Sequence, residues 1–306
     1  MSTQTPVEEI KPFDHRIVVG VDGSDSAKSA ARWGAREAGL RGLRLTLAHA
    51  VVPVVTGGAF GLGMPPRLDF IDELVDAAES ELAQLAEDLD FEHIDIHVEV
   101  GTPSEMLLTA SESATMIVVG SRGQGGFRGL LLGSIGSQVA SHAHCPVIVI
   151  RDVQRPGATE VVVGIDGSPH SVAALNFAFD EASRHGWSIV AVHAWEVPSY
   201  DLIIASDSPP PIPFENTADG EVRLAAEVLS GYRETYPDVE VFERLVRAYP
   251  PLAILDNATD AALIVLGTRG RNAALSAILG SVSYSVLHRA KVPVAIVPLL
   301  GETLES

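Results

Sequence analysis

The chain has 306 residues, of which 46% are hydrophobic and 20% charged, and its formal net charge is −19. This length suffices for two domains of ordinary size, and the composition predicts a packed core. The negative charge argues against nucleic acid and anionic membrane surfaces as partners, because both present phosphates that an acidic surface repels.

Three further features restrict the setting of the protein. The single cysteine, Cys145, excludes an intrachain disulfide and favours a small buried side chain in a reducing cytoplasm. Residues 1–12 are polar and predict a disordered tail without a secretory signal. No apolar run approaches the length of a membrane span. The sequence therefore predicts a cytoplasmic protein.

The first half alternates apolar strands with amphipathic helices. Its first strand leaves Asp22 at its carboxyl end, and Ser24 or Ser26 can cap the helix that follows, which Gly39 or Gly42 can end. The predicted strands are 16–22, 43–50, 94–100, 116–119 and 146–150. The predicted helices are 24–42, 70–89, a helix starting at Thr102, and 134–144. The Gly- and Pro-rich stretch 51–68 predicts a long loop, a candidate lid or interaction surface.

The second half repeats this order after a polar stretch, 151–159, that predicts a linker. Asp166 follows Asp22 by 144 residues, and His193 follows His49 by the same interval. Pro250 follows Pro103 by 147 residues, so three residues are added between the second and third strands of the second half. Its long loop is predicted over 196–219. The alternation in each half predicts a parallel sheet with helices on both faces, within domains at 13–150 and 160–299.

A glycine-rich pattern stands between the fourth strand and the last helix of each half. Gly120-Ser121-Arg122-Gly123 is followed, after nine residues, by Gly133-Ser134. The same spacing recurs 147 residues later, in Gly267, Gly270 and Gly280-Ser281. Glycine lets a backbone approach a ligand, and a helix N-terminus offers unpaired N–H groups to an anion. The pattern therefore predicts a phosphate site in each half, whereas the alternative is a pair of tight turns without a ligand.

The pattern G-x2-G-x9-G-S/T resembles the nucleotide-binding signature of the ATP-binding universal stress proteins. The resemblance covers about residues 13–299 and indicates a tandem, two-domain member. It implies an α/β fold of two doubly wound, parallel, five-stranded sheets of Rossmann-like, adenine nucleotide alpha hydrolase-like type. It also implies the strand order 3-2-1-4-5, which periodicity cannot show.

The two halves carry matching candidate residues for binding the nucleotide. Phosphates are assigned to the glycine loops and the helix starts after them, where a methyl group at Gly120 or Gly267 is expected to abolish binding while the fold survives. The resemblance adds an aspartate beside the nucleotide and an adenine contact just past the second strand. The set is Asp22, Ala50, Gly120, Arg122, Gly123, Gly133, Ser134, Ile135 and Gly136 in the first half, with Asp166, Ala194, Gly267, Arg269, Gly270, Gly280, Ser281, Val282 and Ser283 in the second.

Some of these residues admit other interpretations. Asp22 and Asp166 could cap helices, and Arg122 and Arg269 could be solvated side chains. His49 and His193 are expected in the core or the adenosine pocket. By resemblance, the hydroxyl of Ser283 contacts phosphate, and Gly136 lacks that hydroxyl, so unequal sites are expected.

The resemblance implies a regulatory ATP-binding protein, with Mg²⁺ as a companion ion and an unknown regulatory protein as partner. No Walker-type loop, dinucleotide fingerprint or zinc spacing occurs, and no general base is evident, so at most slow ATPase activity is expected. A slow ATPase, a sensor of another adenine nucleotide such as cyclic AMP, and a structural interaction protein are the alternatives. The apolar last strands, 146–150 and 293–297, predict pairing of the halves and a homodimer through these edges.

Overall fold

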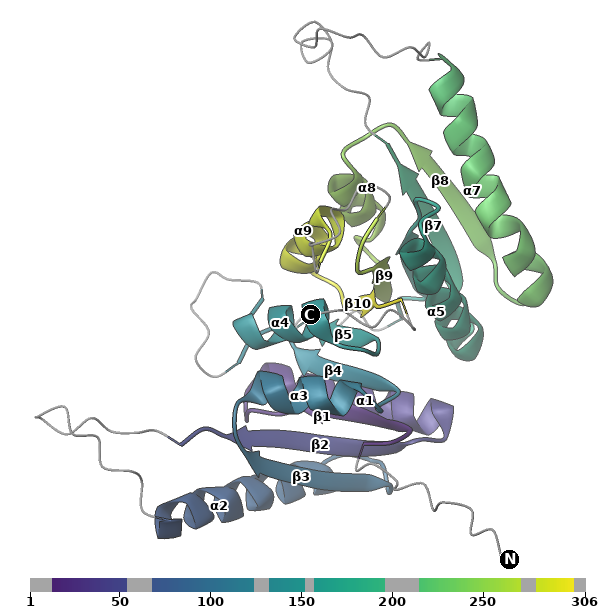
Figure 1. Cartoon of the computed structure of the whole chain (residues 1–306). Helices are drawn as coiled ribbons and strands as arrows, with labels where there is room; N and C mark the ends of the chain where they lie inside the picture. The colour runs from purple at the N-terminus through teal and green to yellow at the C-terminus, as the bar shows by residue number, and fades with distance from the viewer. Residues whose placement is uncertain are drawn as a thin grey trace, which may run out of the picture.

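The computed structural model describes residues 13–53, 68–123, 132–151, 157–195, 215–270 and 279–299. Strands and helices alternate along both halves (Figure 1). The strands are β1 (Arg16–Gly20), β2 (Arg44–Val51), β3 (Ile94–Val100), β4 (Met116–Gly120), β5 (Val147–Ile150), β6 (Glu160–Gly164), β7 (Ser188–Ala194), β8 (Val241–Val246), β9 (Leu263–Gly267) and β10 (Val294–Val297). The helices are α1 (Asp25–Arg41), α2 (Leu68–Glu87), α3 (Pro103–Ser111), α4 (Ser134–His142), α5 (Pro169–His185), α7 (Glu215–Thr235), α8 (Pro250–Asn257) and α9 (Ser281–Arg289).

The ten strands form one continuous sheet in the order β3-β2-β1-β4-β5-β10-β9-β6-β7-β8. Each half has the expected order 3-2-1-4-5 and is parallel throughout. The halves join through β5 and β10, which run antiparallel with Val294 opposite Val149. The α/β class and the strand order of each half are therefore confirmed. The two five-stranded sheets form one ten-stranded sheet because the last strand of each half pairs with that of the other.

This join also corrects the expected homodimer through the last strands. β5 already pairs with β4 on one side and β10 on the other, and β10 pairs with β9 and β5. Neither strand keeps an open hydrogen-bonding edge for a second chain. Pairing of the two halves within one chain is confirmed, and the outer strands of the sheet are β3 and β8.

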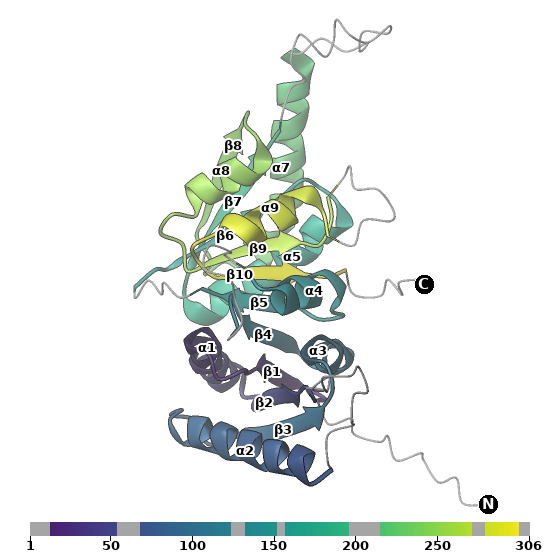
Figure 2. The same ribbon diagram turned by 90° about the vertical axis from the view of Figure 1, so that its left-hand side faces the viewer.

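The core lies in two layers, one on each face of the sheet. Figure 2 shows helices on the two sides of the sheet, with α1 and α3 on opposite faces. Small and branched side chains of α1, α2, α5 and α7 cover one face, and those of α3, α4, α8 and α9 cover the other. Successive residues of a strand point to opposite faces of the sheet, so they belong to different core layers. In β1, Ile17 and Val19 belong to the layer on the side of α1, and Val18 belongs to the other layer. Both layers contain residues of both halves.

The helix ends show how the sequence sets these elements. Ser24 and Ser168 cap α1 and α5 by accepting a hydrogen bond from a first-turn amide. Gly42 and Gly186 end the same helices with positive φ. Gly39, the other candidate, lies inside α1. Thr102 precedes α3 as expected, but its hydroxyl donates to Glu105 (2.6 Å) instead of capping the helix.

Several expectations change or stay open. Helix α7 starts at Glu215, inside the stretch predicted as a loop to 219. The tail, most of both long loops and most of the linker lie outside the described residues. Cys145 is buried, as expected, and burial raises the pKa of its thiol to about 12. Among the described residues, no helix combines the length and apolar character needed to cross a membrane.

Candidate functional site

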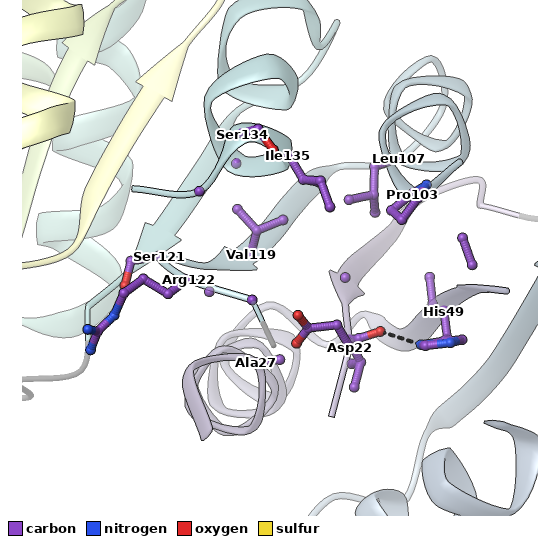
Figure 3. A pocket seen from close by; sticks show the side chains of 18 of the residues that line it. Asp22, Ala27, His49, Pro103, Leu107, Val119, Ser121, Arg122, Ser134 and Ile135 are labelled. Atoms are coloured by element: carbon purple, nitrogen blue, oxygen red, sulfur yellow. Dashed lines mark hydrogen bonds between the residues drawn. The ribbon is translucent and has the colours of Figure 1, made fainter. Parts of the chain in front are cut away.

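A cavity of about 650 Å³ opens at the carboxyl end of the first-half strands (Figure 3). It lies at the ends of the adjacent strands β1 and β4. The helices that follow these strands, α1 and α4, cover opposite faces of the sheet, and ligands usually bind at such a point. All nine residues predicted for the first half line it, from Asp22 and Ala50 to the segment Gly133–Gly136. The fold thus brings together residues spread over more than a hundred positions of the sequence.

Asp22 is the carboxylate of this cavity, and its neighbours hold it in place. The backbone N–H and hydroxyl of Ser24 donate to its Oδ1 at 3.1 and 2.6 Å. The Ser24 oxygen also receives the amide of Ala27, so one serine caps α1 and orients the aspartate. Asp22 therefore stands next to the helix cap rather than forming the cap itself.

Two glycines of the loop are required by close contacts. A Cβ on Gly123 would lie 2.4 Å from Asp22 Oδ2, so the carboxylate lies against the loop backbone. A Cβ on Gly120 would lie 2.7 Å from the Ser26 carbonyl carbon and 2.9 Å from the Ala27 nitrogen. Gly120 does not have positive φ. Its need for glycine comes from the first turn of α1, so Gly120→Ala is expected to disturb the packing of β4 against α1 as well as the loop.

The same reason applies to Gly267. Its Cβ would lie 2.5 Å from the carbonyl oxygen of His170, in the first turn of α5. Both glycines therefore allow a helix start to pack directly on the end of the fourth strand of its half.

The N-terminus of α4 forms the anion-binding part of the cavity. Gly133 is the N-cap residue and supplies no side chain to the first-turn amides, and the first turn contains no acidic residue. The helix starts at Ser134, which was expected to open it. The N–H of Gly133 itself donates to Ser121 O (2.8 Å), which fixes the loop against the strand. The amides of the following turn are the donors that an anion would use.

His49 and Arg122 differ in how they face the cavity. Nδ1 of His49 donates to the carbonyl of Val21 (2.8 Å), because a carbonyl can only accept, and the ring lines the cavity wall as expected. In Figure 3 the guanidinium of Arg122 points away from Asp22 and His49, although the residue lines the cavity.

The apolar wall of the cavity was largely missed by the sequence analysis. Leu107 and Pro103 face Ile135 across the cavity (Figure 3). The sequence did offer one indication of this wall. Because α3 starts just after β3, its first residues lie at the carboxyl end of the strands, where Gly120 also lies. The other lining residues not predicted as contacts are Gly20, Val21, Ala27, Ala48, Met106, Val119, Ser121 and Leu132.

The second half repeats the central geometry. Asp166 Oδ1 receives the N–H of Ser168 (3.0 Å), and a Cβ on Gly270 would lie 2.6 Å from Asp166 Oδ2. Gly280 is the N-cap of α9, without a side-chain cap, and its N–H donates to Thr268 O (2.6 Å). Ala194 ends β7, Arg269 follows β9, and Ser281 and Val282 start α9.

The two halves differ in the contacts around the fourth strand. Ser283 is buried and its hydroxyl donates to the Gly267 carbonyl (2.6 Å), whereas the corresponding Gly136 has no hydroxyl. Thr268 contacts His170 Nδ1 (3.0 Å), where the first half has Ser121 beside Ser26 (3.4 Å). The halves therefore differ in buried packing at this strand, and a phosphate contact of Ser283 stays a prediction.

Comparison with known proteins gives a consistent result. The model of the universal stress protein family matches residues 15–151 and again 158–298. A universal stress protein of Mycolicibacterium smegmatis is 36% identical over 93% of this chain and 97% of its own. One of Mycobacterium tuberculosis is 36% identical over 92% and 95%.

A solved structure has the same fold. The crystal structure of a universal stress protein from Archaeoglobus fulgidus covers 94% of this chain and 97% of its own, with a TM-score of 0.65 and 24% identity. The family match in both halves and the full-length relatives show that this chain belongs to the universal stress protein family, with two copies of the family's domain in tandem.

Proposed function

We propose that this protein is a regulatory ATP-binding module with one nucleotide site in each half, at 13–150 and 160–299. The observation that carries the proposal is the convergence of all nine first-half candidates on one cavity, beside a helix N-terminus that no side chain caps. A helix start of this kind favours anions through its amides and its dipole.

The phosphates belong at the α4 end of the cavity. Gly120, Gly123 and Gly133 keep the backbone bare there, and Ser134, Ile135 and Gly136 supply the first-turn amides. In the second half the same roles fall to Gly267, Gly270 and Gly280, then to Ser281, Val282 and Ser283. Because this arrangement uses amides instead of lysines, it can hold phosphate on a protein whose net charge is −19.

The adenosine belongs at the opposite end, between the apolar wall and the end of β2. Ala50 and His49 line that end, with Pro103 and Leu107 across from them. Asp22 lies between the two ends, where its carboxylate would accept from a ribose hydroxyl or contact Mg²⁺ bound to the phosphates. Asp166 and Ala194 take these positions in the second half, whereas Arg122 and Arg269 flank the loops.

The regulatory role rests on family membership: occupancy by ATP would change how the cytoplasmic protein meets a regulatory partner in stress response or growth control. A homodimer, if it forms, uses a surface other than β5 and β10, because these strands pair with each other. Slow ATP hydrolysis and cyclic AMP sensing are the alternatives that the experiments below separate.

The test places a carboxylate where the phosphate is expected. Gly133 has the extended backbone of an N-cap residue (φ −79°, ψ 161°), and a Cβ there meets only Ser121 O, at 3.8 Å. In Gly133→Asp the new side chain would cap α4 and occupy its amides, so ATP binding in that half should disappear. Stability should stay within about 1 kcal/mol of wild type, because aspartate is a favourable N-cap.

Calorimetry with ATP and Mg²⁺ on nucleotide-free protein should give about two sites in wild type, one in Gly133→Asp and none in Gly133→Asp/Gly280→Asp. Gly220→Asp is the control, because it adds the same charge at an exposed position of α7 with open space around it. Unchanged ATP binding in the folded double variant would refute the site. Competition by cyclic AMP and release of inorganic phosphate distinguish the two alternatives.

A further inference from the structure

A second group of charged side chains lies away from the cavity, where α1 of the first half meets α5 of the second. It consists of Glu37 and Arg41 with Glu181 and His185, here named the interhelix cluster. The repeat offset of 144 relates Glu37 to Glu181 and Arg41 to His185. Both glutamates are buried, with 1% and 0% of their surface exposed. Buried carboxylates require partners, so each oxygen needs to be accounted for.

The interhelix cluster has two different sides. On one side Arg41 contacts Oε1 of both glutamates, with Nε 2.5 Å from Glu37 and a terminal nitrogen against Glu181. On the other side Nε2 of His185 lies 2.9 Å from Glu37 Oε2 and 3.6 Å from Glu181 Oε2. Arg41 is a permanent cation, whereas a histidine ring is a metal ligand in its neutral form.

The histidine side is incompletely satisfied. Glu181 Oε2 is buried and has no hydrogen-bond partner among the described residues. A cation on this side would contact the Glu181 oxygen that has no hydrogen-bond partner.

We propose that Glu37 Oε2, Glu181 Oε2 and His185 Nε2 form a binding site for a divalent transition-metal ion of the Zn²⁺ type. The three ligand atoms lie within 4.8 Å of one another. One imidazole nitrogen with two carboxylate oxygens is a ligand set for Zn²⁺, whereas Mg²⁺ and Ca²⁺ prefer oxygen ligands alone.

The surroundings hold the ligands in place. The ring of His185 stacks on Trp187 (centroids 4.0 Å apart, 14° between planes), and Arg41 fixes the other oxygen of each glutamate. In the metal-bound form the ion takes the place of the hydrogen between His185 and Glu37, and the neutral ring carries its proton on Nδ1. The ion would connect α1 to α5 and thereby one half of the chain to the other.

The experiment uses the full-length, nucleotide-free protein after treatment with a chelator. Equilibrium dialysis against Zn²⁺ should give one bound ion per chain. His185→Gln and Glu181→Gln should weaken binding by more than about tenfold, because loss of an outer-shell partner alone costs roughly 10–100-fold in metal affinity. The glutamine side chain in each of these variants can still donate or accept hydrogen bonds inside the interhelix cluster. His144→Gln, at an exposed histidine, is the matched control and should bind like wild type.

A second measurement keeps the proposal testable if a variant fails to fold. X-ray absorption of the wild-type Zn²⁺ complex should show a first shell of nitrogen and oxygen with one histidine ring. The proposal is overturned if wild type retains no stoichiometric Zn²⁺, if folded His185→Gln binds it as tightly as wild type, or if the spectrum lacks a histidine ligand.

Discussion

At the scale of single residues, the structure separates two glycines that look alike in the sequence. Gly120 packs on the backbone of α1, whereas Gly123 faces the carboxylate of Asp22, a side-chain group that can shift by loosening its hydrogen bonds to Ser24. Gly120→Ala should therefore lower the free energy of unfolding by about 1–3 kcal/mol, the usual cost of overpacking. Gly123→Ala should leave stability near wild type and weaken ATP binding, because it displaces Asp22. Urea unfolding beside calorimetry checks both, and equal stability of the two variants would contradict this assignment.

At the scale of elements, three neighbouring strands are tied by one carboxylate. The carboxylate of Asp95 in β3 accepts two hydrogen bonds from the guanidinium of Arg44 in β2, at 2.8 and 2.6 Å, and one from Arg16 of β1. The hydrogen bond from Arg44 is the main cause that holds the pKa of Asp95 below its usual value. A lowered folded-state pKa stabilises the protein above the unfolded-state pKa, about 3.9, and this stabilisation is lost as the pH falls through the folded-state value. The stability difference between wild type and Asp95→Asn, measured by urea unfolding, should be largest at neutral pH and shrink below about pH 4. A difference that stays constant with pH would show that the ion pairs contribute nothing.

At the scale of the whole molecule, the continuous sheet predicts that both halves unfold together. β5 pairs with β10, and each core layer contains residues of both halves. The three tryptophans allow a direct test: Trp33 lies in the first half, and Trp187 and Trp195 lie in the second. A Trp33→Phe variant and a Trp187→Phe/Trp195→Phe variant report on opposite halves by fluorescence. Their urea midpoints should coincide with those measured by circular dichroism on the same variants, and a midpoint specific to one half would disprove the coupling.

The sequence predicted what depends on local pattern. Strand and helix positions, a serine cap at Ser24 or Ser26, and the glycines of the cavity follow from periodicity and from the repeated spacing. The strand order and the aspartates beside the cavity came from the family resemblance. Contacts between the halves were not predictable in this way, because they depend on how the two copies meet. Arg151, expected in a linker, is instead buried and donates to the carbonyl of Leu287 in α9, and burial lowers its pKa to about 10. The repeat gives no sign of this contact, since proline occupies the corresponding position, 298.

The join between β5 and β10 gives the halves a relation that two separate identical chains cannot have. In a symmetric homodimer every residue near the axis occurs twice, so a change on one side is copied on the other. Here both sides are encoded separately, and a substitution beside the axis changes one partner only. Arg41 and His185 form such an unmatched pair at the contact between α1 and α5. Covalent fusion thus allows the two copies to diverge into unequal, complementary partners.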